Sequence, residues 1–273
     1  MISDTDVARG VLLAQRARKS ILEMTHRAQV SHVASALSVV DILAAIYARP
    51  SAPKNHTLND LDREIVILSK GHSAAALYAV LSELDFFPRD WLAEYCNDSA
   101  RLGGHVTSKD VPGVELSTGS LGHGLPYGLG VALSRKISNV MSPVVVVISD
   151  GECNEGTTWE SALIANRFKL DNLIVVIDRN RIQSLDLTEN TIPLEPLGEK
   201  WKSFGWQVSE IDGHSIAEIQ LALETRNTCK VLIANTIKGK GVSFMENSVK
   251  WHYKPPTDQE LELALLEVLG IED

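Results

Sequence analysis

Two oxygen-bearing side chains, Asp150 and Asn180, each stand just after an apolar run of the sequence and could together bind a divalent cation. Asp150 follows the run 144–148 (VVVVI), and Asn180 follows the run 173–177 (LIVVI). Carboxylate and amide oxygens are ligands that Mg²⁺ and Ca²⁺ use, especially where a bound phosphate supplies further oxygens. Gly151 would let the backbone approach a diphosphate closely, and the helix that begins there could direct free N–H groups at it. These residue types therefore predict a site for a metal-bound diphosphate.

The elements that must position this pair form a strand–turn–helix–strand unit. Two short β-branched runs flank a stretch with helical period, which predicts the βαβ unit of a parallel sheet. The right-handed crossover of such a unit brings both strand ends to the sheet edge where open α/β folds bind ligands. Taken alone, Asp-Gly after a strand is more often an ordinary turn, and Asp-x-Asn is turn chemistry as well. The choice between a turn and a binding site therefore depends on the rest of the chain.

Strands alternate with helices along the rest of the chain, which predicts an α/β fold with a doubly wound, mainly parallel sheet flanked by helices. We expect one domain over residues 1–273, with a C-terminal helix at about 257–270. Thr257 and Glu260 form a capping box at the start of that helix. Further strands are expected at 64–68, 206–211 and 231–236, and further helices at 7–26 and 197–204.

The composition excludes several classes of function. The 273 residues are 44% hydrophobic, which is ample for a buried core, and they carry a formal net charge of −9 with a pI near 5.4. This charge argues against nucleic acid or an anionic membrane as the main partner. Three cysteines without C-x-x-C spacing, no signal-like start and no membrane-length apolar run favour a cytoplasmic protein without a structural zinc site.

Five of the eight histidines stand in segments that we expect at the strand-end edge of the sheet. A single loop histidine is more often a solvated or capping residue than a catalytic one. Several histidines beside a metal-bound diphosphate fit donors to anionic oxygens or carriers of protons from hydroxyl groups, and their spacing is too wide for a preformed zinc site. The segment 29–38 is expected to be a loop, with Ser38 as the cap of a helix over 39–47. The five are His32, His72, His105, His123 and His252; we expect His26, His56 and His214 to be structural or on the surface.

Several ordered motifs resemble the thiamine-diphosphate enzymes, and specifically the N-terminal half of transketolase. The stretch from Asp150-Gly151 to Asn180 is similar to that family's cofactor signature, GDG followed about thirty residues later by Asn, with Ser149 in place of the first Gly. The resemblance spans roughly 7–256. Its other motifs are LSKGH at 68–72, GH at 104–105, STGSLG at 117–122 and KGKG at 238–241.

The resemblance implies a thiamine diphosphate cofactor held through Mg²⁺ or Ca²⁺. Asp150, Asn180 and the backbone carbonyl of Ile182 would bind the metal ion. The backbone amide of Gly151 and the side chain of His72 would contact the diphosphate. Two further cofactor contacts are implied beside the aminopyrimidine ring, Gly119 and Leu121.

The resemblance also implies an activity, the transfer of a two-carbon ketol unit from a ketose, expected to be phosphorylated, to an aldose. The thiazolium ring would attack the ketose carbonyl and store the resulting carbanion, while protein groups move protons and stabilise oxyanions. His32, His105 and His252 would face the reacting carbon and the hydroxyl groups of the donor. Glu155 would lie at a subunit interface, in the carboxylate network of the paired active site.

A full transketolase is longer, and its second half supplies the pyrimidine-binding domain. The resemblance therefore implies that the partner is a C-terminal, pyrimidine-domain polypeptide, in a heterotetramer with two copies of each chain, and that this chain has no activity alone. Two alternatives remain open: a 2-oxoacid decarboxylating or carboligating subunit with the same cofactor, and a non-catalytic homologue. His32 and His105 favour ketose chemistry over the first, and the Asp150–Asn180 pair argues against the second.

Overall fold

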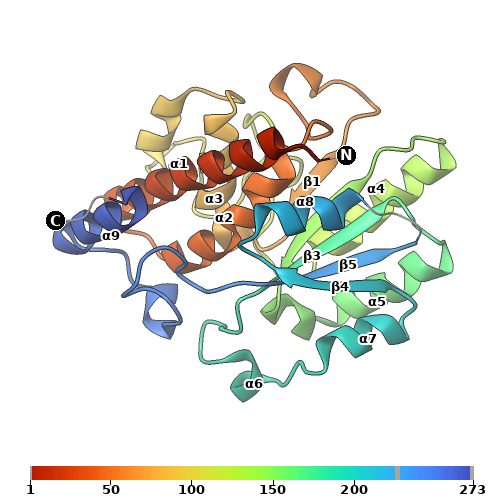
Figure 1. Ribbon diagram of the computed structural model, residues 1–273. Coiled ribbons are helices and arrows are strands. Elements are labelled where there is room, and N and C mark those ends of the chain that lie inside the picture. The colour runs from red at the N-terminus through yellow and green to blue at the C-terminus, as the bar shows by residue number, and fades with distance from the viewer. Residues whose placement is uncertain (1, 225–227, 271–273) are drawn as a thin grey trace.

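The computed structural model of the chain, which describes residues 2–224 and 228–270, is centred on a five-stranded sheet (Figure 1). Its strands are β1 (Ile65–Leu68), β2 (Val144–Ser149), β3 (Leu173–Arg179), β4 (Gln207–Asp212) and β5 (Lys230–Asn235). They lie in the order β1-β2-β3-β5-β4, and each neighbouring pair is parallel. The expected parallel α/β fold is confirmed. The domain expected over 1–273 includes residues 1, 225–227 and 271–273, which lie outside the described residues.

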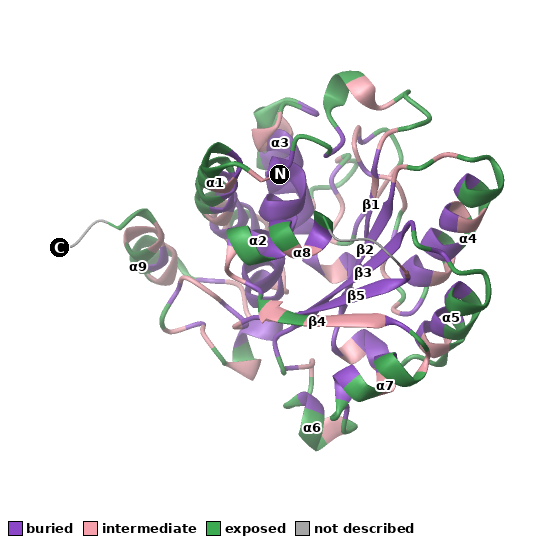
Figure 2. Cartoon of the chain, turned by 45° about the vertical axis from the view of Figure 1, so that its right-hand side comes forward, coloured by how far each residue is buried: buried purple, intermediate pink, exposed green. Residues whose placement is uncertain are grey.

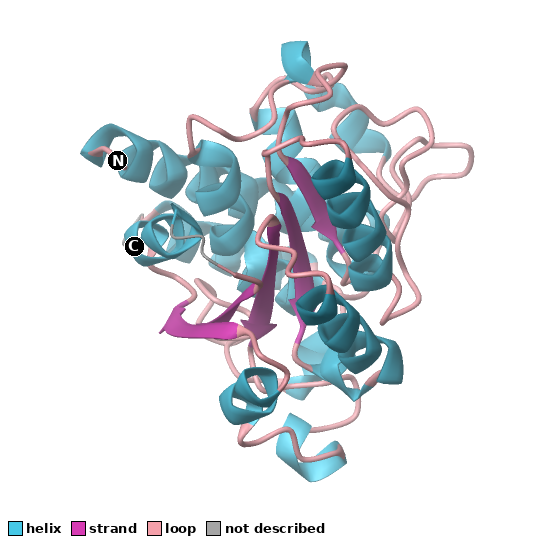
Figure 3. Cartoon of the chain, turned by 90° about the vertical axis from the view of Figure 1, so that its right-hand side faces the viewer, coloured by secondary structure: helices cyan, strands magenta, loops and turns pink. Residues whose placement is uncertain are grey.

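Helices cover both faces of this sheet (Figure 3). One layer contains α1 (Asp4–Ala28), α2 (Val33–Ala48), α3 (Ala74–Glu83) and α8 (Ile216–Glu224), with α9 (Asp258–Leu269) packed on α1; the other contains α4 (Gly124–Ile137), α5 (Gly156–Arg167) and α7 (Leu197–Ser203). Successive side chains of a strand point to opposite faces. Val145 and Val147 of β2 accordingly pack in the core of the first layer, and Val144 and Val146 pack in that of the second. The short helices are α6 (Thr188–Thr191) and the 3-10 turns Asn55–Thr57, Gly71–Ser73, Arg89–Glu94, Gly151–Asn154 and Val249–His252.

Helix α2 begins earlier than the sequence predicts, which corrects the expected loop over 29–38. It starts at Val33, directly after His32, whose φ is 75°. All 16 of its residues are buried (Figure 2), so it lacks the polar face that makes a helix recognisable in a sequence. Ser38 therefore lies inside the helix and does not cap it: its hydroxyl donates to Asp178 Oδ2 at 2.6 Å.

The C-terminal helix α9 forms where its cap signals predict it. Thr257 and Glu260 make the expected reciprocal capping box at the start of α9, and Gly270 ends that helix with a φ of 67°, the left-handed conformation that glycine adopts without strain. Within residues 2–224 and 228–270, no helix is both long and apolar enough to cross a membrane.

Candidate active site

A cavity of about 260 Å³ opens at the carboxyl ends of the strands and contains nearly all of the residues predicted to be functional. Two larger hollows of the described part, about 550 and 650 Å³, contain none of these residues. Among the predicted residues, Glu155 does not line the cavity. Those that do are His32, His72, His105, Gly119, Leu121, Asp150, Gly151, Asn180, Ile182 and His252.

The carboxylate of Asp150 is buried and held by three donors. Its Oδ1 accepts from the backbone N–H of Gly151 at 2.7 Å, and its Oδ2 accepts from the N–H of Arg181 at 2.6 Å and from Arg179 Nη1 at 3.2 Å. Burial and the nearby charge of Asp178 raise the pKa of this carboxyl group. A bound cation would offset both effects, which fits a metal ligand.

The amide of Asn180 has a fixed orientation beside Asp150. Its nitrogen donates to Ser38 Oγ at 3.2 Å and to Asp178 Oδ2 at 3.3 Å, and its oxygen accepts from the N–H of Ile182 at 3.1 Å. The register that pairs Ser149 with Asp178 brings the ends of β2 and β3 together. The two predicted oxygen ligands therefore share one cavity, which favours a binding site over a pair of ordinary turns.

A cation already lies against the third predicted metal ligand. Lys238 Nζ donates to the carbonyl oxygen of Ile182 at 3.0 Å and lies at hydrogen-bond distance, 2.8 Å, from Nδ1 of His252. In the described part of the chain, no group of three His, Cys, Asp or Glu side chains could hold a metal ion by itself. A divalent ion here would thus need the carboxylate, amide and carbonyl oxygens together with oxygens of its ligand, which suits a diphosphate-bound Mg²⁺.

Four histidines also line the cavity, with three of them around His32. The centre of its ring lies 5.3 Å from that of His72, 5.8 Å from that of His105 and 4.9 Å from that of His252. Burial, together with neighbouring cations, lowers the pKa of His32 to about 4 and that of His252 to about 3. Burial also places the pKa of His72 well below its usual value. These three rings are therefore neutral at pH 7.

Neutral rings of this kind can accept or donate hydrogen bonds to a substrate. When Lys238 is protonated, Nδ1 of His252 can only accept from it, and Nε2 of His252 then carries the ring proton and can donate. Nδ1 of His32 is buried and has no hydrogen-bond partner among the described residues. The cavity thus combines an oxygen-rich wall that suits a cation with a histidine wall that suits hydroxyl and carbonyl groups.

Two expectations about single residues need correction or remain open. The sequence predicts His123 beside the other histidines, but it is exposed, its Nδ1 lies 3.0 Å from the carbonyl of Leu121, and it does not line the cavity. Glu155 is exposed at the start of α5. A Cβ added to Gly122, whose φ is 79°, would lie 2.7 Å from Cβ of Glu155, so the glycine-rich loop packs tightly against this residue. Its expected role at an interface stays a prediction.

Three buried charged residues of the site were not predicted. Lys70 forms an ion pair with Asp178, which also accepts from Thr236, and both side chains are fully buried. Burial and the charge of Lys70 lower the pKa of Lys238 to about 7. Lys70 and Lys238 stand in the LSKGH and KGKG motifs, so the sequence did contain a signal, although it did not indicate a role.

Comparison with known proteins places this cavity in a family. The chain matches the family model "Transketolase, thiamine diphosphate binding domain" over residues 12–272. It is 40% identical over 254 residues to an apulose-4-phosphate transketolase subunit of Actinobacillus succinogenes, and the match covers 92% of each chain. It is 36% identical to the 6-deoxy-6-sulfo-D-fructose transketolase subunit SqwG of a Clostridium strain, covering 92% of this chain and 93% of that one.

Longer transketolases match over part of their length. Human transketolase is 32% identical over 257 residues, which cover 93% of this chain and 41% of that protein. The solved transketolase of Campylobacter jejuni superposes with a TM-score of 0.84 at 27% identity, covering 98% of this chain and 43% of that one. The chain thus spans about two fifths of the length of these transketolases. Together with the match to the family model, these similarities show that the chain belongs to the transketolase family, as its thiamine-diphosphate-binding part.

Proposed function

We propose that this chain is the cofactor-binding subunit of a two-subunit enzyme that transfers a two-carbon ketol unit from a ketose to an aldose. The observation that carries the proposal is the shared cavity, in which Asp150, Asn180 and the carbonyl of Ile182 face a wall of histidines. Two relatives that match over most of their own length are named as transketolase subunits for sugar derivatives, apulose 4-phosphate and 6-deoxy-6-sulfo-D-fructose. A phosphorylated or otherwise anionic ketose fits these names.

We propose that the oxygen-rich wall holds thiamine diphosphate through a divalent ion, Mg²⁺ or Ca²⁺. Asp150, Asn180 and Ile182 would bind the ion, while the N–H of Gly151 and the ring of His72 would contact the diphosphate. Gly119 and Leu121 would line the aminopyrimidine ring. When bound, the cofactor supplies an electron sink for the carbanion.

The chain's own residues would bind the donor and move its protons. The Nε2–H of His252 would donate to a donor hydroxyl or carbonyl oxygen, and Nδ1 of His32 would accept a hydroxyl proton. His105, the most exposed of the three, would contact the end of the donor nearer the cavity mouth. Because His32 stays neutral at pH 7, it could accept a proton from a hydroxyl group without first losing one.

We propose that a second polypeptide completes the site, in an assembly with two copies of each chain. Relatives of similar length are named as subunits of a transketolase, and longer transketolases contain further sequence that this chain does not match. The exposed Glu155 would lie at an interface of that assembly. We further propose that residues 1–273 form one diphosphate-binding domain and, from three free cysteines and the acidic composition, that the protein is cytoplasmic.

The proposal is tested by activity of the assembled enzyme. The chain would be co-purified with the product of a neighbouring pyrimidine-domain reading frame and supplied with thiamine diphosphate and Mg²⁺. We expect consumption of a ketose donor, with apulose 4-phosphate and 6-deoxy-6-sulfofructose as first probes, and none by this chain alone. Turnover of a 2-oxoacid donor instead of a ketose would contradict the proposed reaction, and full activity of the single chain would contradict the split site.

A further inference from the structure

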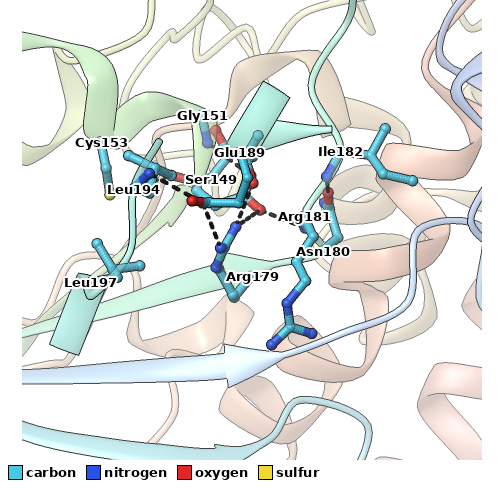
Figure 4. A network of polar contacts seen from close by, with 12 residues as sticks. Ser149, Gly151, Cys153, Arg179, Asn180, Arg181, Ile182, Glu189, Leu194 and Leu197 are labelled. Atoms are coloured by element: carbon cyan, nitrogen blue, oxygen red, sulfur yellow. Dashed lines mark hydrogen bonds and ion pairs between the residues drawn. The ribbon is translucent and has the colours of Figure 1, made fainter. Parts of the chain in front are cut away.

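The guanidinium of Arg179 connects the metal side of the cavity to the segment 183–197, which we call the strap. Arg179 is the last residue of β3 and is 1% exposed. Its Nη1 donates to Asp150 Oδ2 at 3.2 Å, and its Nη2 donates to Glu189 Oε1 at 3.2 Å and to Glu195 Oε1 at 2.7 Å. Figure 4 shows the guanidinium of Arg179 reaching towards Glu189 of the strap. The single guanidinium of Arg179 therefore donates hydrogen bonds to three carboxylates.

The strap carboxylates that contact Arg179 also organise the strap itself. Glu189 Oε1 accepts from the N–H of Leu194 at 3.1 Å, and Glu195 Oε2 accepts from the N–H of Leu197 at 2.8 Å. At its other end the strap borders the cavity, where Gln183 lies in the lining. The strap thus contacts Arg179 through its carboxylates and lines the cavity through its first residues.

Asp150 can lose its contact with Arg179 and still keep other hydrogen-bond donors. At 3.2 Å this contact is as long as that with Glu189 and longer than the 2.7 Å contact with Glu195. Asp150 also accepts from the backbone N–H groups of Arg181 at 2.6 Å and Gly151 at 2.7 Å. A divalent ion on Asp150 would repel the guanidinium and replace its charge there. The rigid, forked guanidinium could keep both strap carboxylates, which a single ammonium group could not do as well.

We propose that Arg179 is a positioning residue for which Asp150 and the strap carboxylates compete, so that loading of the metal site tightens the strap. Glu189 and Glu195 neutralise part of the guanidinium charge and leave Asp150 available to a second cation. Loss of Glu195 leaves more of that charge at Asp150 and opposes metal binding. The identity of the ion rests on the proposed function, whereas the competition itself is a property of the described residues alone.

Metal affinity tests one direction of this competition. Mn²⁺ would be titrated into the full chain with thiamine diphosphate, and the free ion followed by electron paramagnetic resonance. We expect Glu195→Gln to weaken Mn²⁺ binding about fivefold or more, although Glu195 does not line the cavity. Glu199→Gln is the matched control, because Glu199 is exposed and pairs with Lys202, and it should leave the affinity unchanged. In a chain that already carries Arg179→Lys, the further change Glu195→Gln should alter the Mn²⁺ affinity little.

Amide hydrogen exchange tests the other direction without any cofactor. We expect Asp150→Asn to slow exchange at the strap amides of Leu194 and Leu197, because the guanidinium of Arg179 then forms ion pairs only with the strap carboxylates. Unchanged or faster exchange in Asp150→Asn, or unchanged or tighter Mn²⁺ binding in Glu195→Gln, would overturn the proposal. Failure of the wild-type chain to bind Mn²⁺ with thiamine diphosphate would count against the proposed function, and the exchange result would still decide the competition.

Discussion

The two walls of the cavity differ in how their polar atoms are paired. On the diphosphate wall, formed by Asp150, Asn180 and Ile182, both side chains are held by several hydrogen bonds. On the histidine wall, formed by His32, His105 and His252, Nδ1 of His32 is buried without a partner among the described residues. Both walls are built from residues that follow or precede regular elements, so location in the fold does not explain the difference.

The difference indicates how one cavity could both hold a cofactor and act on a substrate. A ligand atom that is already oriented by neighbours binds an ion without further ordering. A buried ring with unused hydrogen-bonding capacity is costly for stability, but it can take up a proton or a hydroxyl group that arrives later. The diphosphate wall is thus organised for binding and the histidine wall for reaction. The following predictions separate these two roles.

The largest effect is expected from Asp150→Asn. This change removes the only carboxylate of the proposed oxygen set, so we expect the affinity for Mg²⁺ and thiamine diphosphate to fall by more than about 100-fold, the upper end of what loss of a supporting partner costs. Isothermal titration calorimetry would measure it. Asp98→Asn, at an exposed loop position, is the control. Near-normal affinity in Asp150→Asn would contradict the assignment of Asp150 as a metal ligand on the diphosphate wall.

A change on the histidine wall should have the opposite signature. We expect His32→Asn in the assembled enzyme to lower kcat by about 100-fold or more, while the dissociation constant of thiamine diphosphate stays close to that of the wild type. Steady-state kinetics and calorimetry on the same preparation would check this. If cofactor affinity fell as much as kcat, the separation into two walls would not hold.

The cavity histidines and the buried Asp178, which supports Asn180, should respond to different ranges of pH. Because burial lowers the pKa of His32 to about 4 and that of His252 to about 3, the unfolded state binds more protons than the folded state below pH 6.5. The free energy of unfolding should therefore fall by a few kcal/mol as the pH falls from about 6.5 to about 4. Lys70 and other partners, against the effect of burial, lower the pKa of Asp178, so the stability it contributes is lost only below about pH 4.

Urea unfolding at a series of pH values would measure this dependence. His252→Asn should flatten the curve between about pH 6.5 and pH 3, the range over which this ring binds a proton in the unfolded state but not in the folded state. His56→Gln, at an exposed position outside the cavity, serves as the control. A wild-type curve that is flat across this range would show that the histidine wall is not held neutral by the fold.

The smallest effect is expected from Ser38→Ala, which removes one hydrogen-bond partner of Asn180 on the diphosphate wall. Its hydroxyl accepts from the Asn180 amide at 3.2 Å, and Asp178 Oδ2 remains as a second acceptor for the same amide. We expect about 1 kcal/mol of weaker metal binding, the usual contribution of one hydrogen bond. The calorimetric titration described for Asp150→Asn would detect it, and a loss as large as in that variant would mean that Ser38 ligates or shapes the site directly.

The sequence predicted the sheet and the cavity well where local signals were strong. The runs around Asp150 and Asn180 became adjacent strands because parallel pairing of buried β-branched segments leaves few alternatives. The start of α2 was missed because a helix buried on all sides has no periodic pattern. The role of Arg179 was not predicted, since its three carboxylate partners come together only when the strap folds back. His123 was misplaced because the turn of the glycine-rich loop decides which face of the loop it occupies.

The central claim is that Asp150, Asn180 and Ile182 bind the divalent ion of the cofactor. Anomalous diffraction from crystals of the chain grown with Mn²⁺ and thiamine diphosphate would test it most directly. We predict one manganese peak within ligand distance of the Asp150 carboxylate, the Asn180 amide oxygen and the Ile182 carbonyl, with Lys238 Nζ moved away from that carbonyl. A manganese peak elsewhere on the protein, with Lys238 still bonded to Ile182, would contradict the account.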